Sequence, residues 1–233
     1  MDIQPSTTRA IRAQDKTTNE HKSDYPTSKS IWVHQACNTK AILFYFSLIC
    51  QKPILAGLAG YIFSDLITGV YHWSIDNYGD AKTPIFGSQI EGFQGHHEKP
   101  WIITRKHIAT NLYELSQIIT LIFLPINLIC NNPILLAFVG SLSTGVLFCQ
   151  QFHAWSHTTN NKLPTIVVAL QDLGVLVSRS QHAAHHHALF NSNYCIVSGI
   201  WNNFLDEIRV FEAFEKVIFF WFGVKPRSWN ELT

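Results

Sequence analysis

Gln181-His182-Ala183-Ala184-His185-His186-His187 is the densest histidine segment of the chain, and it follows an apolar run. In a helix, His182, His185 and His186 occupy positions i, i+3 and i+4, so their imidazoles project from one face. Grouped imidazoles are costly to dehydrate and repel one another once protonated, whereas iron, zinc and copper all bind imidazole. The segment therefore favours a metal site over the alternative, a solvated polar patch.

Three further groups with ligand-like spacing precede this segment: His72 with Asp76, His96 with His97, and His153 with His157. Two of these pairs have the i, i+4 spacing, which places two donors on one helical face, as in the HExxH motif that chelates one metal. Adjacent histidines diverge by about 100° on a helix, so such a pair can serve two different metals.

The four groups together supply nitrogen and oxygen donors and no cysteine. A nitrogen-rich set with a carboxylate suits non-haem iron and dioxygen chemistry, and it is larger than a single zinc ion needs. We therefore predict a two-metal site with the ligands His72, Asp76, His96, His97, His153, His157, His182, His185 and His186. The remaining histidines, His21, His34, His107 and His187, are interpreted as surface residues.

Composition indicates a membrane protein. Hydrophobic residues make up 47% of the chain and charged residues 14%, against an ordinary charged fraction of about 25%. The formal net charge is +1, which excludes the strongly basic field of a nucleic-acid-binding protein.

Apolar stretches predict an all-α membrane protein with about four transmembrane helices, each needing about 20 residues. Lys52-Pro53 is interpreted as a break between the first two stretches, and Asn131-Asn132-Pro133 as a turn between the last two. The expected spans are 32–51, 53–71, 112–130 and 134–152.

The segments between and after these spans determine where the histidines lie. Residues 74–111 contain many Gly and Pro breakers and are expected to be loop-like. Residues 163–177 are too short for a span, and if they do not cross, every histidine group lies at one membrane face. Residues 208–223 predict a helix lying at the membrane surface. Residues 1–30 are expected to be a disordered or targeting segment, and residues 31–233 one membrane domain.

Asp65 lies inside the second expected span, seven residues before His72 and so on the same helical face. An intramembrane carboxylate is a functional candidate, and Asp65 is expected either to orient a metal-binding histidine or to be satisfied by Ser64 or Thr68. Four basic residues are candidates for holding a lipid phosphate or an acidic electron carrier, with ordinary positive charge beside a membrane as the alternative: Lys99, Arg105, Lys106 and Arg179.

Five segments, in order and spacing, resemble the lipid desaturase family, which includes plasmanylethanolamine desaturases and plant plastid desaturases of the fatty acid desaturase 4 type. They are GVYHWSIDNYGD (69–80), EGFQGHHEKPWIITR (91–105), QQFHAWSH (150–157), LQDLGVLVSRSQHAAHH (170–186) and NYCIVSGIWNNFLDE (193–207). The resemblance is stronger to the plant type and runs from about Pro53 to Trp229.

The resemblance implies a desaturase in which the nine predicted ligands hold two iron ions and O2 is a co-substrate. In the plant type, the implied substrate is the palmitoyl group of plastid phosphatidylglycerol, which gains a trans double bond near its carboxyl end. No dinucleotide-binding fingerprint is present, so electrons are expected from a partner such as ferredoxin or cytochrome b5. The expected location is a chloroplast membrane, thylakoid or envelope, with the endoplasmic reticulum as the alternative. Alternative functions are a plasmanylethanolamine-type ether-lipid desaturase and a metal-dependent membrane hydroxylase.

Overall fold

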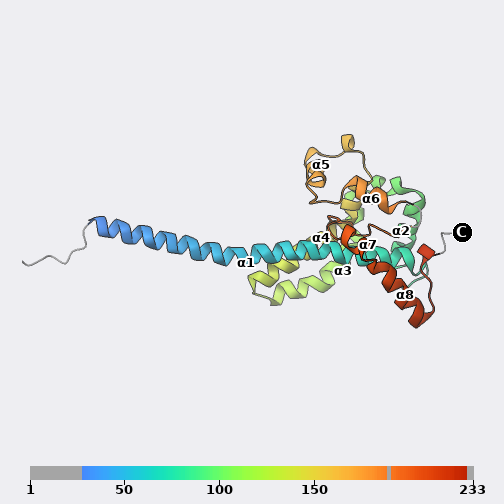
Figure 1. Ribbon diagram of the computed structural model, residues 1–233, viewed down its shortest axis with the longest axis horizontal. Helices are drawn as coiled ribbons and strands as arrows, with labels where there is room; N and C mark the ends of the chain where they lie inside the picture. The colour runs from blue at the N-terminus through green and yellow to red at the C-terminus, as the bar shows by residue number, and fades with distance from the viewer. Residues whose placement is uncertain (1–27, 188–189, 230–233) are drawn as a thin grey trace, which may run out of the picture. The chain divides into compact units, whose positions relative to one another are not determined.

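The computed structural model describes residues 28–187 and 190–229, and in these residues all regular secondary structure is helical (Figure 1). Residues 1–27 of the expected disordered or targeting segment 1–30 lie outside the described residues. The helices are α1 (Ser28–Asn77), α2 (Gly87–Glu98), η1 (Pro100–Arg105), α3 (Ile108–Ile129), α4 (Pro133–Ser156), η2 (Asn160–Lys162), α5 (Thr165–Asp172), α6 (Arg179–His185), α7 (Asn202–Glu207), α8 (Val210–Phe222) and η3 (Arg227–Trp229).

The chain divides into two compact units, residues 1–46 and 47–233. In the first unit, the described residues belong to the beginning of α1, and apolar side chains such as Phe44 and Phe46 are exposed there. The second unit holds all the other helices and all nine predicted ligands.

The expected break at Lys52-Pro53 is wrong, because α1 continues through Pro53. Proline removes one backbone N–H and disturbs one turn, a cost that long apolar helices tolerate. By length and composition, two helical segments could cross a membrane, Asn38–Asn77 and Pro133–Ser156, whereas Leu115–Ile129 is apolar but shorter. The expected number of about four spans is therefore not confirmed.

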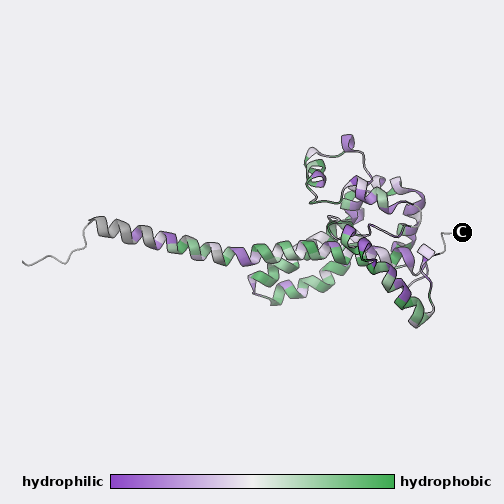
Figure 2. Cartoon of the chain, in the orientation of Figure 1, coloured by the Kyte–Doolittle hydropathy of each residue, from purple (hydrophilic) through white to green (hydrophobic). Residues whose placement is uncertain are grey.

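Helices α3 and α4 form the expected hairpin and lie side by side (Figure 1). The turn between them is stabilised by Asn132, whose side chain accepts hydrogen bonds from the N–H groups of Ile134 and Leu135, and by Pro133 in the first turn of α4. Figure 2 shows that this hairpin and the end of α8 are largely hydrophobic, whereas hydrophilic residues concentrate on α2 and α6.

Glycines bring α1 and α4 into close contact within the second unit. A Cβ atom at Gly60 would overlap the backbone oxygen of Phe138, and one at Gly145 would overlap the Ser64 hydroxyl. Only glycine permits this approach, which fixes how His72 on α1 and His153 on α4 face one another.

The region expected to be loop-like, residues 74–111, contains helices α2 and η1. Ile90 and Phe93 of α2 pack against Ile75 of α1 in a small buried cluster. This packing compensates for the low helix propensity of Gly92 and Gly95 and places the pair His96 and His97 beside α1.

Two other segments are helical as expected. Residues 163–177 contain only the short α5, and residues 208–223 contain α8, whose place at a membrane surface stays a prediction. The histidine-rich segment forms α6, which begins at a capping box in which the Ser178 hydroxyl accepts from the Gln181 N–H.

Candidate metal centre

The structure brings all nine predicted ligands together in two adjoining groups. The first, here called the five-histidine group, consists of His96, His153, His157, His182 and His186. The second, here called the mixed group, consists of His72, Asp76, His97 and His185. Within each group the candidate ligand atoms all lie within 4.8 Å of one another. Each group therefore has enough donors at suitable distances to hold one metal ion.

The mixed group is centred on Asp76, whose carboxylate Oδ2 lies 3.1 Å from His72 Nε2, 3.5 Å from His97 Nε2 and 3.4 Å from His185 Nε2. These donors come from three helices, because α1 carries His72 and Asp76, α2 carries His97 and α6 carries His185. Three nitrogens and one carboxylate facing one point form the kind of donor set that non-haem iron uses.

The five-histidine group is held by close nitrogen contacts. His96 Nε2 lies 2.9 Å from His157 Nε2, and His182 Nε2 lies 3.2 Å from His186 Nε2. The ring of His153 lies 4.3 Å from that of His182 between centroids. The two groups adjoin each other through His72 and His153, whose ring centroids are 5.6 Å apart.

Several buried polar atoms in these groups have no hydrogen-bond partner, and they include both ring nitrogens of His153 and Oδ1 of Asp76. His153 is 1% exposed, so these nitrogens are also shielded from water. Leaving such atoms unpaired costs free energy, and a bound cation would satisfy them. The residues present therefore fit a metal in each group.

Backbone carbonyls orient two of the mixed-group imidazoles. His72 Nδ1 lies 2.9 Å from the carbonyl oxygen of Tyr194, and His185 Nδ1 lies 2.7 Å from that of Ser192. A ring that donates its Nδ1–H to a carbonyl presents the Nε2 lone pair on its other side. In both rings that lone pair faces Asp76.

Burial keeps the candidate imidazoles on α2, on α6 and just after each of α4 and α6 uncharged. It is the main cause that lowers the pKa of His97 to about 4, that of His157 to about 3 and that of His186 to about 2. Burial and neighbouring imidazoles also hold the pKa of His182 well below its usual range. Neutral imidazole is the form that binds metals, so these rings are ready to act as ligands at neutral pH.

Asp65 has partners that differ from both expectations. Its Oδ1 accepts backbone hydrogen bonds from Val197, Ser198 and Gly199 at 2.8 to 3.0 Å, rather than contacting His72. The Thr68 hydroxyl donates to the Asp65 backbone carbonyl, not to its carboxylate. The physical reason lies in the path of the chain after Tyr194. It passes α1 with three consecutive backbone N–H groups that point at the Asp65 carboxylate, and this carboxylate accepts a hydrogen bond from each of them.

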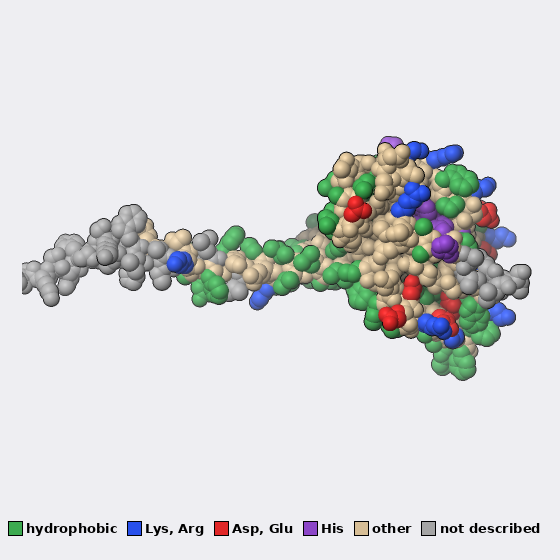
Figure 3. All heavy atoms as spheres, turned by 45° about the horizontal axis from the view of Figure 1, so that its top comes forward, with side chains coloured by type: hydrophobic (Ala, Val, Ile, Leu, Met, Phe, Trp, Pro, Cys, Tyr) green, Lys and Arg blue, Asp and Glu red, His purple; other side chains and the backbone are tan. Residues whose placement is uncertain are grey.

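The four basic candidates lie around this centre without joining it. Lys99 and Lys106 line a cavity that reaches the five-histidine group, Arg105 is exposed at the end of η1, and Arg179 is exposed at the start of α6. Figure 3 shows lysine and arginine side chains spread around the histidine atoms on one face.

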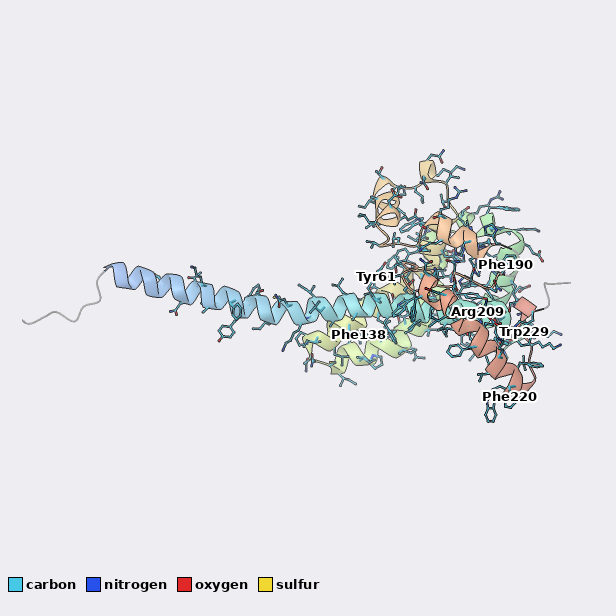
Figure 4. All side chains as sticks on the ribbon, in the orientation of Figure 1. Tyr61, Phe138, Phe190, Arg209, Phe220 and Trp229 are labelled. Carbon is cyan, nitrogen blue, oxygen red and sulfur yellow. The ribbon has the colours of Figure 1, made fainter. Side chains whose placement is uncertain are left out.

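Sequence reasoning missed three contributors to this site. The carbonyls of Ser192 and Tyr194 act through the backbone, so their side-chain types give no signal. Phe190 stacks on His97 with ring centroids 4.3 Å apart, and it is labelled in Figure 4. The one available signal concerned Tyr194, because residues 193–207 form a segment with family resemblance but no assigned role, and it did not extend to Phe190 or Ser192.

Comparison with known proteins identifies relatives that cover most of the second unit. Residues 61–229 match the family profile described as the lipid desaturase domain. The chain is 56% identical to fatty acid desaturase 4, chloroplastic, from Arabidopsis thaliana, over 86% of this chain and 64% of that protein. It is 50% identical to fatty acid desaturase 4-like 1, chloroplastic, from the same plant, over 90% and 75% of the two chains.

A more distant relative is plasmanylethanolamine desaturase 1 from Mus musculus, 34% identical over 75% of this chain and 68% of that protein. The chain thus spans about two thirds of the length of several relatives. No solved structure matches the chain.

Proposed function

The chain belongs to the lipid desaturase family, and we propose that it is a membrane acyl-lipid desaturase that holds two iron ions in its two ligand groups. The observation that carries this proposal is the pair of adjoining groups, of four and five donors, at the junction of α1, α2, α4 and α6. The relatives named in the comparison are desaturases, which are oxidoreductases.

The reaction would convert –CH2–CH2– to –CH=CH–, with O2, two electrons and two protons giving two molecules of water. Iron with O2 supplies the oxidising power for an unactivated C–H bond, which side-chain acids and bases lack. The protein's own part is to hold neutral imidazoles in place. The carbonyls of Tyr194 and Ser192 fix the rings of His72 and His185, and burial keeps bulk water away from Asp76.

For the substrate, we propose the palmitoyl group of phosphatidylglycerol, with a trans double bond formed near the carboxyl end. The higher identity to the chloroplastic relatives supports this plant-type assignment over the ether-lipid type. The same relatives support a chloroplast membrane as the location, with the endoplasmic reticulum as the alternative. The electrons would come from ferredoxin in a plastid or from cytochrome b5 elsewhere.

The test is expression of the full chain in a host with an added electron donor, followed by lipid analysis by head group. We expect a new trans double bond in the palmitate of phosphatidylglycerol and about two iron ions in the purified protein, as a two-site centre requires. His153→Ala and His182→Ala should abolish the product while the protein still accumulates. His187→Ala is the matched control, because His187 is exposed and outside both groups.

The same lipid analysis separates the alternatives. A vinyl ether product would indicate the plasmanylethanolamine type, named in the mouse relative, and a hydroxylated chain would indicate a hydroxylase. Full activity in either histidine variant would overturn the ligand assignment.

A further inference from the structure

A cavity of about 330 Å3 lies beside the candidate metal centre, between α2, η1, α3 and α4. Ligand sites of small molecules have volumes of about 300 to 1,000 Å3 and are mostly apolar with a few placed polar groups. This cavity has an apolar part formed by the buried side chains of Phe93, Ile103 and Leu115. It therefore has the size and the interior of a site for part of an apolar chain.

The cavity reaches one of the two ligand groups. His96 and His153 of the five-histidine group are among its lining residues, whereas the lining contains no member of the mixed group. Both ring nitrogens of His153 lack a hydrogen-bond partner, although this side chain is 1% exposed. A chain in the cavity would thus meet the centre from the side of His153.

Glycine keeps one wall of the cavity open. Gly92 and Gly95 are three residues apart on α2, and both line the cavity. A Cβ atom added at either position would meet no other atom within 4 Å. Neither glycine is therefore required by close packing of the protein, unlike Gly60, and the space beside them remains free for a ligand.

The part of the cavity beside the end of α2, one turn after His96, carries charge. Lys99 and Lys106 are exposed lining residues, and the exposed Glu91 and Glu98 line the same cavity. An ammonium group is a point charge that binds phosphate, and carboxylates accept hydrogen bonds from hydroxyl groups. A ligand with a phosphate, hydroxyls and an apolar chain complements this arrangement.

We propose that this cavity is the entry site of a glycerophospholipid, whose phosphate binds Lys99 and Lys106, whose carboxyl end lies at the five-histidine group and whose remaining acyl chain continues past Gly92. The proposal rests on the proposed desaturase function. It adds the place where the lipid binds, the direction in which the acyl chain lies and the residue that limits the width of the acyl path. Gly92 is a specificity-determining residue in this arrangement, because any side chain there projects into the acyl path.

The test compares Gly92→Ala, Gly92→Leu and the matched control Gly140→Leu in the full chain purified in detergent. Gly140 is also a helical glycine at which an added Cβ meets nothing within 4 Å, but it lies on α4 away from the cavity lining. Alanine and leucine both favour helix over glycine, so loss of α2 is not expected in any variant.

We expect Gly92→Leu to keep the iron content of the wild type and to lose about 100-fold in initial rate on phosphatidylglycerol, since misplacement of a reacting chain by about 1 Å has that order of effect. Gly92→Ala should have an intermediate rate, and Gly140→Leu the wild-type rate. In a second arm, Lys99→Gln with Lys106→Gln should raise KM for phosphatidylglycerol several-fold, and an unchanged KM would overturn the binding of the phosphate by these two lysines.

The experiment distinguishes failure of this cavity proposal from failure of the proposed desaturase function. A wild-type protein without iron or product would refute the desaturase itself. An active wild type together with a fully active Gly92→Leu variant would overturn the cavity as the acyl path. Loss of iron in Gly92→Leu would show that this residue supports the metal centre instead, which would also overturn the proposal.

Discussion

Asp65 is the residue on which the backbone around the candidate centre depends most directly. Its carboxylate accepts three consecutive backbone N–H groups, from Val197 to Gly199, and the same buried segment supplies the Tyr194 carbonyl to His72. A change at Asp65 therefore reaches a metal ligand through the backbone rather than by contact.

Asp65→Ala should destabilise the protein severely, because it leaves three buried N–H groups without an acceptor at a cost of about 1 to 3 kcal/mol each. Asp65→Asn keeps one side-chain oxygen in the same position and should cost much less. Thermal unfolding in detergent, together with iron content, measures both effects. Equal losses in the two variants would show that the charge, not the hydrogen bonding, is what the fold needs.

Asp76 provides a test of the division into two groups. It is the only carboxylate among the nine candidate ligands, and it faces His72, His97 and His185. Asp76→Ala should reduce bound iron from two ions to about one, because removing a ligand weakens its own site first. Metal analysis of the purified variant checks this, with Asp172→Ala as the control since Asp172 is exposed on α5. Retention of both ions would show that the carboxylate is not a ligand.

At the residue scale, sequence spacing was sufficient to choose the nine candidates but not to pair them. Adjacent histidines were expected to diverge, and His96 and His97 do belong to different groups. His182, His185 and His186 were expected on one face, yet His185 faces the mixed group while the other two face the five-histidine group. The assignment of these three histidines to two groups depends on where α1 and α4 lie around α6. The spacing of residues within one helix does not specify the positions of other helices.

Among the helices, the contact between α1 and α4 depends on glycine. Gly60→Ala should lower the free energy of unfolding by about 1 to 3 kcal/mol, the usual cost of overpacking, because the added Cβ would overlap the Phe138 backbone. Gly140→Ala should be neutral or slightly stabilising, because its Cβ meets open space and alanine is the better helix former. Thermal unfolding of both variants in detergent measures the difference. A stable Gly60→Ala protein would mean that the two helices can move apart.

Sequence reasoning was most accurate for helices with clear end signals and least accurate where packing overrides propensity. Asn132-Pro133 marked the start of α4 correctly. Pro53 marked a break that is absent, and the glycines of α2 concealed a helix that Phe93 stabilises by packing against α1. Both errors arise because local propensities of about 1 to 3 kcal/mol are smaller than the gain from burial or from apolar surroundings.

For the molecule as a whole, the α3–α4 hairpin has its turn at one end, and the candidate centre lies at the other end. Its ligands sit at the end of α1 and of α4, whereas the hairpin turn is at residues 130–132. Phe211 of α8 packs into the core, whereas Val217, Trp221 and Phe222 are exposed, and Phe220, 81% exposed, is labelled at the end of this helix in Figure 4. This arrangement is expected of a protein whose hairpin crosses the bilayer and whose α8 lies in the interface.

The whole-molecule prediction is that the α3–α4 turn and the histidine-bearing end lie on opposite sides of the membrane. Cys130 is a native, partly exposed thiol at the turn, and Asn161 is exposed in η2, beyond the histidine-bearing end of α4. In sealed vesicles holding the Asn161→Cys variant, an impermeant maleimide should label only one of these two positions, and after permeabilisation it should label both.

Mass spectrometry assigns the label to its cysteine, so the other native thiols need not be replaced. Buried Cys149 and Cys195 serve as internal controls that should stay unlabelled until the protein unfolds. Labelling of Cys130 and of the thiol introduced at position 161 from the same side would show that the hairpin does not cross. The histidine groups would then have to reach their lipid from a protein lying on one leaflet, with the exposed apolar residues of α8 and the α3–α4 hairpin inserted side by side.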